Sequence, residues 1–315
     1  MSDKRVLVTG GGGFIGRWSL QPLRERGYEV HTILSVAKFA APEMRRHLEG
    51  VTPHHVDLFD SDAVRATVRG VHATHLLHFA WNTAPRAYWT SPDNFRWVSA
   101  SLELLRSFVL AGGRRVVMAG SCAEYDWHVA RVCHEFQTPL ASDGGSEAAP
   151  YATCKVALQK MLSSLARQQK FSAAWGRIFF QFGPDEDTGR LVASVISNLL
   201  AGYEAKCSHG NQVRNYLYVQ DVGAAFAAVL DSAIEGPVNI GSREHHSIRD
   251  LVYRIADIIG APELIRLGAH PAPNDPPLLV PDVRRLYDSV GWRPSFGLDD
   301  GLTATIEAAR IASKK

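Results

Sequence analysis

The sequence has no long hydrophobic run and almost no excess of charge of either sign. No apolar stretch approaches the roughly 20 residues that a membrane-spanning helix needs, so we expect no membrane contact. The 34 basic and 32 acidic side chains leave a formal charge of +2 and form no basic patch, so we expect no nucleic-acid partner. With 46% hydrophobic residues, the composition is typical of a soluble globular protein.

Cysteine is also scarce. The four cysteines, Cys122, Cys133, Cys154 and Cys207, show neither the paired spacing of a metal site nor a dense disulfide pattern. The N-terminal MSDKRVLVTG enters a predicted strand without a signal-peptide pattern. Both observations indicate a reducing, cytoplasmic location.

Histidine is more frequent, and its tightest group is His72, His75 and His78 in VHATHLLHFA. On a strand, His75 faces the opposite side from the other two. No carboxylate or cysteine stands near them in a zinc-like arrangement. We therefore expect strand and loop histidines and no metal site.

Strand and helix patterns alternate along the chain. The 315 residues suffice for one large domain or two. The predicted strands are 5–9, 28–34, 51–56, 75–80, 114–119, 171–180 and 236–242. The predicted helices are 14–26, 61–70, 93–111, 151–169 and 247–260. This alternation predicts an α/β fold with a parallel sheet covered by helices on both faces.

A glycine-rich turn, TGGGGFIG, follows the first predicted strand at residues 9–16. Two glycine frames fit, one starting at Gly10 and the other at Gly11, and both continue through Gly13 and Gly16. In either frame, backbone N–H groups can approach a pyrophosphate, and the next helix begins there with partial positive charge. The strand–turn–helix context predicts a dinucleotide site. The residues expected to contact the cofactor here are Gly10, Gly13, Phe14, Ile15 and Gly16.

The second and third predicted strands bear on the choice of nucleotide. Ser35 and Lys38 follow the second strand, where NAD-preferring sites usually place a carboxylate. A 2′-phosphate is tolerated there, so we favour NADP(H) and keep NAD(H) as the alternative. After the third strand come Asp57 and Leu58, which we also place in the cofactor site. The Asp57 carboxylate either contacts the adenine or caps the next helix.

A tyrosine and a lysine lie one helical turn apart in PYATCK, residues 150–155. Tyr151 and Lys155 share a helix face, and a nearby ammonium favours tyrosinate and lowers the tyrosine pKa. Ser121, in GSCAEYDW, follows a strand at the sheet edge where α/β proteins bind ligands. Its hydroxyl has three possible roles: helix cap, nucleophile or hydrogen-bond donor. Because no G-x-S-x-G elbow surrounds it, we expect Ser121 to polarise a carbonyl or carbinol while Tyr151 transfers the proton.

The chain resembles the extended short-chain dehydrogenase/reductase family, of the NAD-dependent epimerase/dehydratase type that acts on nucleotide sugars. The resemblance rests on three motifs in this order: TGGGGFIG, GSCAEY and Y-A-T-C-K. The likeness covers nearly the whole chain. It implies a Rossmann-type doubly wound parallel sheet with a smaller C-terminal substrate-binding domain. The expected boundaries are 1–176 for the dinucleotide domain and 177–315 mainly for the substrate domain, with 214–241 returning to the first.

The resemblance also implies roles for single residues and frequent homodimers. Tyr151 would be the acid/base, Lys155 would hold the nicotinamide ribose and tune Tyr151, and Ser121 would bond the reacting sugar oxygen. The segment VRNYLYVQDV resembles one whose arginine grips the substrate diphosphate, a role that falls to Arg214. Phe180 stands where many members carry asparagine, in the substrate site. Aromatic residues in predicted loops either line the sugar pocket or pack in the core: Trp81, Tyr88, Trp89 and Trp127.

Departures from the family pattern narrow the activity. Cys122 and Ala123 stand where 4,6-dehydratases carry Asp-Glu, which argues against dehydration. Ala123 also replaces the cysteine of GDP-fucose synthases. The segments CAEYDW and WNTAPRAYW look most like those of deoxysugar reductases and epimerases. We therefore expect reduction of an NDP-4-keto-6-deoxyhexose at C4, with an NAD-dependent NDP-sugar 4-epimerase as the alternative. A non-catalytic dinucleotide sensor is a third possibility, although such proteins typically lose the tyrosine or lysine.

Overall fold

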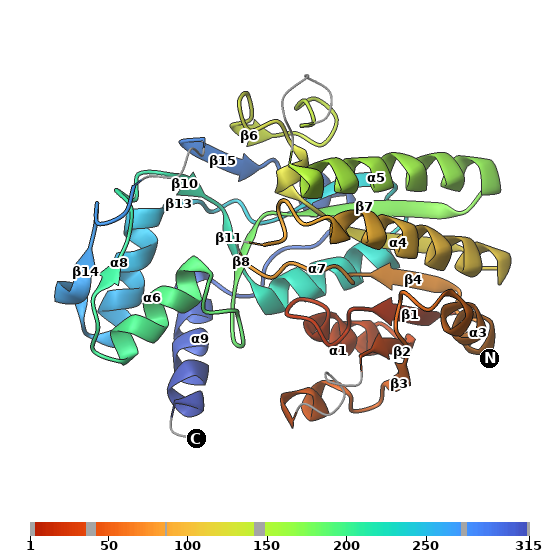
Figure 1. Cartoon of the computed structure of the whole chain (residues 1–315), viewed down its shortest axis with the longest axis horizontal. Helices are drawn as coiled ribbons and strands as arrows, with labels where there is room; N and C mark the ends of the chain where they lie inside the picture. The colour runs from red at the N-terminus through yellow and green to blue at the C-terminus, as the bar shows by residue number, and fades with distance from the viewer. Residues whose placement is uncertain (1–3, 36–41, 86, 142–148, 272–275, 314–315) are drawn as a thin grey trace.

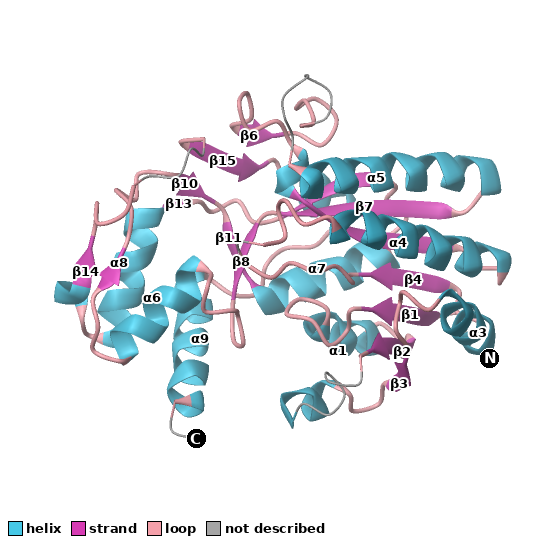
Figure 2. Cartoon of the chain, viewed as in Figure 1, coloured by secondary structure: helices cyan, strands magenta, loops and turns pink. Residues whose placement is uncertain are grey.

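The central element of the computed structural model is a seven-stranded parallel sheet in the order β12-β7-β5-β4-β1-β2-β3 (Figures 1 and 2). The structure describes residues 4–35, 42–85, 87–141, 149–271 and 276–313. The strands of this sheet are β1 (Arg5–Thr9), β2 (Glu29–Leu34), β3 (Thr52–His55), β4 (His75–His78), β5 (Arg115–Ser121), β7 (Ser172–Ile178) and β12 (Gly236–Ile240).

Helices cover both faces of the sheet. On one face lie α3 (Ser61–Val71), α4 (Asp93–Leu110) and α5 (Pro150–Gln169), and on the other lie α1 (Arg17–Glu25) and α7 (Val219–Asp231). The adjacent residues Leu76 and Leu77 of β4 show why: their side chains point to opposite faces, and each is fully buried in a different core. Phe108 of α4 packs in the core of Leu76, and Phe226 of α7 packs in that of Leu77. Apolar strands with this environment are typical of a doubly wound sheet.

The chain reverses direction across the sheet at β1. Strands β2 and β3 extend the sheet on one side of β1, and β4, β5 and β7 extend it on the other. Such a switch point leaves a crevice outside the carboxyl ends of the strands, where open α/β sheets bind ligands. The predicted Rossmann-type fold class is confirmed.

The C-terminal part has its own core. Helices α6 (Leu191–Leu200), α8 (Ile248–Ile259) and α9 (Leu298–Ala312) lie side by side beyond the end of the sheet, and Val195, Val252 and Leu302 are buried between them (Figure 1). The remaining strands form a four-stranded sheet in the order β13-β10-β15-β6 and the pairs β11-β8 and β14-β9. Their bounds are β6 (Val132–Cys133), β8 (Phe180–Phe182), β9 (Ala205–Lys206), β10 (Val213–Arg214), β11 (Tyr216–Tyr218), β13 (His246–Ser247), β14 (Ile265–Arg266) and β15 (Leu278–Pro281). The domain boundaries expected from the sequence stay a prediction.

Two element ends differ from the expected ones and matter for the site. Helix α1 begins at Arg17 rather than Phe14, because residues 14–16 form turns, in which the N–H groups of Trp18 and Ser19 donate three residues back, to the Ile15 (3.0 Å) and Gly16 (3.1 Å) carbonyls. Strand β5 continues to Ser121, which pairs with Ile178 of β7 and therefore belongs to the sheet edge itself.

His78 of β4 has a structural role in the sheet. His78 is buried, and its two ring nitrogens lie 2.6 Å from the Thr9 hydroxyl and 2.9 Å from that of Ser101. Burial lowers the pKa of His78 to about 3, so the ring is neutral and links β4 to β1 and α4. No cluster of possible metal ligands occurs in the described part of the chain.

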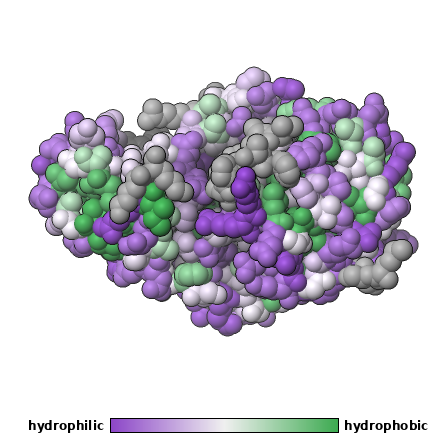
Figure 3. Space-filling view, turned by 90° about the horizontal axis from the view of Figure 1, so that it is seen from below, coloured by the Kyte–Doolittle hydropathy of each residue, from purple (hydrophilic) through white to green (hydrophobic). Residues whose placement is uncertain are grey.

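The face seen in Figure 3 is mainly hydrophilic, with small hydrophobic patches. Across the described ranges, no helix combines the length and the apolar character that crossing a bilayer requires.

Candidate active site

The glycine turn after β1 leaves no room for side chains at Gly10 and Gly16. Gly10 has a φ of +71°, and a Cβ there would lie 2.7 Å from the Ala80 nitrogen. A Cβ on Gly16 would collide with the Gly10 carbonyl. Gly10, Gly13 and Gly16 line the main cleft, whereas a Cβ on Gly11 would instead meet Thr32 of β2. The structure therefore favours the frame that begins at Gly10, and the cradle fits the pyrophosphate of a dinucleotide.

The main cleft of the molecule has a volume of about 810 Å³ and opens at the carboxyl ends of β1, β4 and β5. It brings together most of the residues expected in the site. These are Gly10, Gly13, Phe14, Ile15, Gly16, Trp81, Ser121, Trp127, Tyr151, Lys155 and Phe180. Segments more than a hundred residues apart in the sequence thus meet in one cavity large enough for a small-molecule ligand.

Gly13 allows a direct test of the cradle. A Cβ there would lie 3.0 Å from the Gly10 carbonyl oxygen and meet no other atom within 4 Å, so a side chain requires a shift of this turn by a few tenths of an ångström. Gly13→Val should lower the affinity for NADPH or NADH by at least about tenfold, a loss of about 1.4 kcal/mol. Fluorescence titration measures the affinity. Gly70→Ala on α3, where a Cβ meets nothing within 4 Å, should bind as wild type; equal affinity in the Gly13 variant would rule out the cradle.

Four expected site residues do not line the cleft: Ser35, Asp57, Leu58 and Arg214. Ser35 is exposed just beyond β2, and Lys38 lies outside the described residues. Asp57 is exposed and accepts a hydrogen bond from the Phe59 N–H (3.0 Å). The cap of α3 is Asp60, whose Oδ1 accepts from the Asp62 and Ala63 N–H groups, so Asp57 is not the cap.

Arg214 lies behind the cleft rather than in it. Only 3% of the residue is exposed, and the centre of its guanidinium lies 5.5 Å from the centroid of the Phe180 ring, which does line the cleft. The next residue, Asn215, donates from Nδ2 to the Ser242 carbonyl (3.0 Å). Asn215 therefore fastens the β10–β11 connection to the loop after β12.

Ser121 begins a single 3₁₀ turn, Cys122–Glu124. Its Oγ accepts a hydrogen bond from the Ala123 N–H (3.2 Å), so the serine is a cap. The hydroxyl also hydrogen-bonds the side chain of Tyr151 and thereby lowers the tyrosine pKa in part. The same side chain thus fixes the local turn and reaches the predicted proton donor.

Tyr151 and Lys155 lie in the first turns of α5 and are both buried, at 6% and 4% exposure. Burial raises the pKa of Tyr151 well above its usual value. The structure differs here from the expected lowering by Lys155. Loss of solvation is the largest cause of the raised pKa, the charges of neighbouring acidic groups raise it further, and only the hydrogen bond with Ser121 lowers it. Burial also lowers the pKa of Lys155 to about 7. Its ammonium donates to the Ala119 carbonyl (2.9 Å) and lies 3.8 Å from the centroid of a Trp81 ring.

Aromatic side chains surround Tyr151. Its ring centroid lies 4.8 Å from that of Tyr88, 5.7 Å from that of Trp89 and 6.4 Å from that of Trp81. Trp127 packs on Trp89 at 5.7 Å and donates to the Cys122 carbonyl (3.0 Å). We call Trp81, Tyr88, Trp89 and Trp127 the aromatic wall; all four line the cleft, which favours the pocket interpretation of these residues.

Two arginines in the cleft were missed by the sequence analysis. Arg17 is buried and forms an ion pair with Asp185 (2.9 Å) across 168 residues of sequence. Arg190 donates to the Thr83 carbonyl (3.0 Å) beside the aromatic wall. The only sequence signal was the position of Arg17 directly after the last glycine of the turn.

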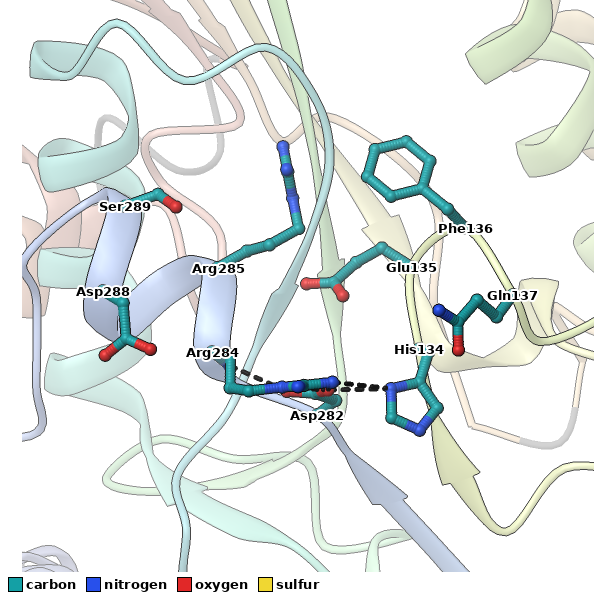
Figure 4. A pocket seen from close by; sticks show the side chains of 9 residues that line it. All are labelled: His134, Glu135, Phe136, Gln137, Asp282, Arg284, Arg285, Asp288 and Ser289. Atoms are coloured by element: carbon teal, nitrogen blue, oxygen red, sulfur yellow. Dashed lines mark hydrogen bonds and ion pairs between the residues drawn. The ribbon is translucent and has the colours of Figure 1, made fainter.

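A second, smaller pocket of about 280 Å³ lies away from the cleft (Figure 4). His134 and Arg284 both contact the Asp282 carboxylate there, at 2.7 Å and 2.8 Å. This pocket shares no lining residue with the cleft and contains none of the residues expected in the site. The cleft is therefore the candidate active site.

Comparison with known proteins agrees with this geometry. The chain is 27% identical over 312 residues to UDP-glucuronic acid decarboxylase 1 of Xenopus tropicalis, covering 98% of this chain and 72% of the relative. It is 26% identical over 330 residues to UDP-glucose 4-epimerase of Erwinia amylovora, covering 95% and 96%. The solved structure of the Thermus thermophilus UDP-glucose 4-epimerase complex with NAD is 27% identical, with a TM-score of 0.80 and coverage of 97% and 99%.

The model of the NAD dependent epimerase/dehydratase family matches residues 6–241, from β1 to the end of β12. This range contains the glycine cradle and the Ser121, Tyr151 and Lys155 side chains, and it makes up more than half of the chain. The protein therefore belongs to the NAD-dependent epimerase/dehydratase family, whose members act on nucleotide sugars.

Proposed function

We propose that this protein reduces the C4 ketone of an NDP-4-keto-6-deoxyhexose, with NADPH as its preferred reductant. The observation that carries the proposal is the aromatic wall around Tyr151. Aromatic faces suit the apolar C–H groups and the C6 methyl group of a deoxysugar. Cys122 and Ala123, which line the cleft beside Ser121, have no carboxylate for the proton transfers of dehydration, so the keto group must already be present in the substrate.

Each catalytic side chain has a role that its surroundings support. Ser121 donates a hydrogen bond to the ketone oxygen and polarises the carbonyl. Tyr151 delivers the proton to that oxygen; its raised pKa keeps the phenol protonated at neutral pH, the form that a reduction requires. Lys155 supplies positive charge beside the developing oxyanion and would hold the nicotinamide ribose. The bound nicotinamide supplies the hydride, and the glycine cradle would hold its pyrophosphate.

The residues after β2 favour NADPH. The sequence has no Asp or Glu between Glu29 and Glu43, so no carboxylate follows this strand to bond the ribose hydroxyls of NAD. The Thermus thermophilus relative was solved with NAD, so NADH is the second candidate. A homodimer, frequent in the family, is also part of the proposal.

The second candidate function is an NDP-sugar 4-epimerase. It is favoured by the similarity to the Erwinia amylovora and Thermus thermophilus UDP-glucose 4-epimerases. An epimerase uses the same three residues but recycles its hydride, so it needs no added reductant. The two candidates therefore differ in redox balance.

The deciding experiment supplies NDP-4-keto-6-deoxyhexoses with NADPH or NADH, and in parallel NDP-hexoses without added cofactor. We expect one NADPH to be consumed per product, followed by its absorbance. Formation of a C4 epimer without reductant, together with no oxidation of NADPH on any keto-sugar, would contradict the reductase and favour the epimerase. If the protein binds NADPH but converts neither the keto-sugars nor the NDP-hexoses, the dinucleotide sensor is the remaining possibility.

The sequence-based role of Arg214, a grip on the substrate diphosphate, stays a prediction, and it requires the guanidinium to reach past Phe180, behind which it lies. Loss of a hydrogen bond to a charged group costs about 1.5–3 kcal/mol, so Arg214→Ala should raise KM for the sugar nucleotide roughly tenfold or more. The KM for NADPH should stay near wild type. Arg190→Ala is the comparison, since Arg190 lines the cleft directly. If only Arg190→Ala raises KM, the diphosphate is bound by Arg190 and the role given to Arg214 is wrong.

A further inference from the structure

A buried carboxylate stands directly behind the catalytic serine. Glu124 has no exposed surface and is the third residue after Ser121 in the capping turn. Its Oε1 accepts a hydrogen bond from the Ser121 backbone N–H at 2.8 Å. Its Oε2 accepts from Arg177 Nε at 2.8 Å, and the Trp175 indole N–H donates to Oε1 at 2.9 Å. Because Arg177 and Trp175 both belong to β7, the carboxylate is fixed against the sheet.

The ion pair behind Ser121 is itself held in place. Arg177, 1% exposed, donates from Nη1 to the Tyr125 hydroxyl (3.2 Å) and to the Glu135 carbonyl (3.0 Å). The Tyr125 hydroxyl donates to Asn239 Oδ1 (2.7 Å), and the Asn239 N–H donates to Glu135 Oε1 (3.0 Å). Glu135 lines the small pocket of Figure 4. Satisfied buried networks of this kind are rigid, and breaking one partner is costly.

Glu124 also lies near the catalytic lysine. Lys155 Nζ is 6.0 Å from the centroid of a Trp175 ring, and the N–H of that indole donates to Glu124 Oε1 at 2.9 Å. Burial lowers the pKa of Lys155, and the negative charge of Glu124 opposes this by raising it. Among the described residues, the other titratable side chains that interact with Lys155 are Tyr151 and Cys154 on α5, the former with its ring centroid 5.9 Å from Nζ, and the neutral His78 of β4. Among the described groups, Glu124 is thus the carboxylate that favours the ammonium form of a lysine with almost no access to solvent.

We propose that Glu124 is a positioning residue that holds Ser121 at the end of β5 and keeps Lys155 in its ammonium form. The inference rests on the proposed roles of Ser121 and Lys155, but not on the identity of the sugar. Glu124 acts through these two residues and does not itself line the cleft. A carboxylate buried only for stability would affect neither the protonation of the lysine nor the reactivity of the serine.

Two substitutions separate charge from position. Glu124→Gln keeps an oxygen that can accept from the Ser121 N–H but removes the charge. It should lower the Lys155 pKa by roughly one unit, because an opposite charge nearby no longer favours the ammonium. Glu124→Asp keeps the charge, and with it an ion pair, on a side chain shorter by one methylene group. It therefore provides a second test if Glu124→Gln does not fold. It should lower kcat about tenfold, the loss of one good hydrogen bond, with the Lys155 pKa nearly unchanged.

The Lys155 pKa is read without turnover, by NMR titration of protein labelled at lysine ¹³Cε, with the signal assigned by its loss in Lys155→Met. The control is Glu135→Gln, which removes another buried carboxylate of the same network that does not contact Ser121. It should leave the Lys155 titration unchanged.

The proposal is overturned if folded Glu124→Gln titrates as wild type, if Glu135→Gln shifts Lys155 equally, or if Glu124→Asp retains full kcat on whichever nucleotide sugar the protein converts. Failure of every keto-sugar assay would affect only the proposed function, because the titration needs no substrate.

Discussion

Tyr151→Phe is expected to lower kcat by roughly 10²–10⁴-fold, the usual contribution of general acid catalysis, while NADPH binds as before. The substitution removes only the hydroxyl that delivers the proton. The phenyl ring keeps its contacts with Tyr88 and Trp89, at 4.8 Å and 5.7 Å, so the pocket should stay intact. Steady-state kinetics on a keto-sugar substrate and a fluorescence titration of NADPH measure the two effects separately.

The matched control is Tyr28→Phe. Tyr28 is as buried as Tyr151, at 5% exposure, and its hydroxyl lies 3.1 Å from Asp231, outside the cleft. This variant should lose stability but keep kcat. A folded Tyr151→Phe protein with wild-type kcat would remove Tyr151 from the mechanism.

Lys155→Met is expected to lower kcat/KM on the order of 10²–10³-fold, the usual effect of removing one electrostatic contact to a developing oxyanion. The wild-type activity should also depend on pH in a defined direction. Burial lowers the pKa of Lys155 to about 7, so the ammonium is present below that pH and is lost above it. Activity that needs the charge therefore falls as pH rises through about 7.

Two lysine variants test this pH dependence. Lys155→Arg keeps a charge throughout the range, since arginine stays protonated, so its activity, although lower, should no longer fall near neutral pH. Lys160→Met removes an exposed lysine from the same helix and should leave both rate and profile unchanged. A Lys155→Met protein that still loses activity through the same pH range would show that another group titrates.

Sequence reasoning was strongest where a few neighbouring residues decide the structure. The apolar strands, the glycine turn and the i, i+4 pair of Tyr151 and Lys155 are local patterns, and the structure has all of them. The start of α1 was placed three residues early, because hydrophobic periodicity continues through Phe14 and Ile15 while the backbone there still forms the turn. The end of β5 was also predicted too early, at residue 119, because Ser121 is polar but still pairs with β7.

Contacts between distant residues could not be read from the sequence. The ion pair of Arg17 with Asp185 and that of Glu124 with Arg177 each join segments from different elements. Glu124 was visible only as the fifth letter of GSCAEYDW, and nothing local shows that its carboxylate is fully buried. The sequence analysis predicted the Tyr151 pKa from the neighbouring lysine alone. The structure shows that burial dominates this pKa, and much of that burial comes from the aromatic wall. The sequence placed the aromatic residues in loops, but it could not show where those loops lie.

A labelled hydride tests the proposed C4 ketoreductase site most directly. NADPH carrying deuterium at the transferred position of the nicotinamide is incubated with the protein and an NDP-4-keto-6-deoxyhexose, and the product is examined by NMR and mass spectrometry. We expect one deuterium per product, bound at C4 in a single configuration, and roughly 10²–10⁴-fold slower formation of this labelled product by the Tyr151→Phe protein. A product without deuterium at C4, or with the label at another carbon, would contradict the assignment of Ser121, Tyr151 and Lys155 as a C4 ketoreductase site.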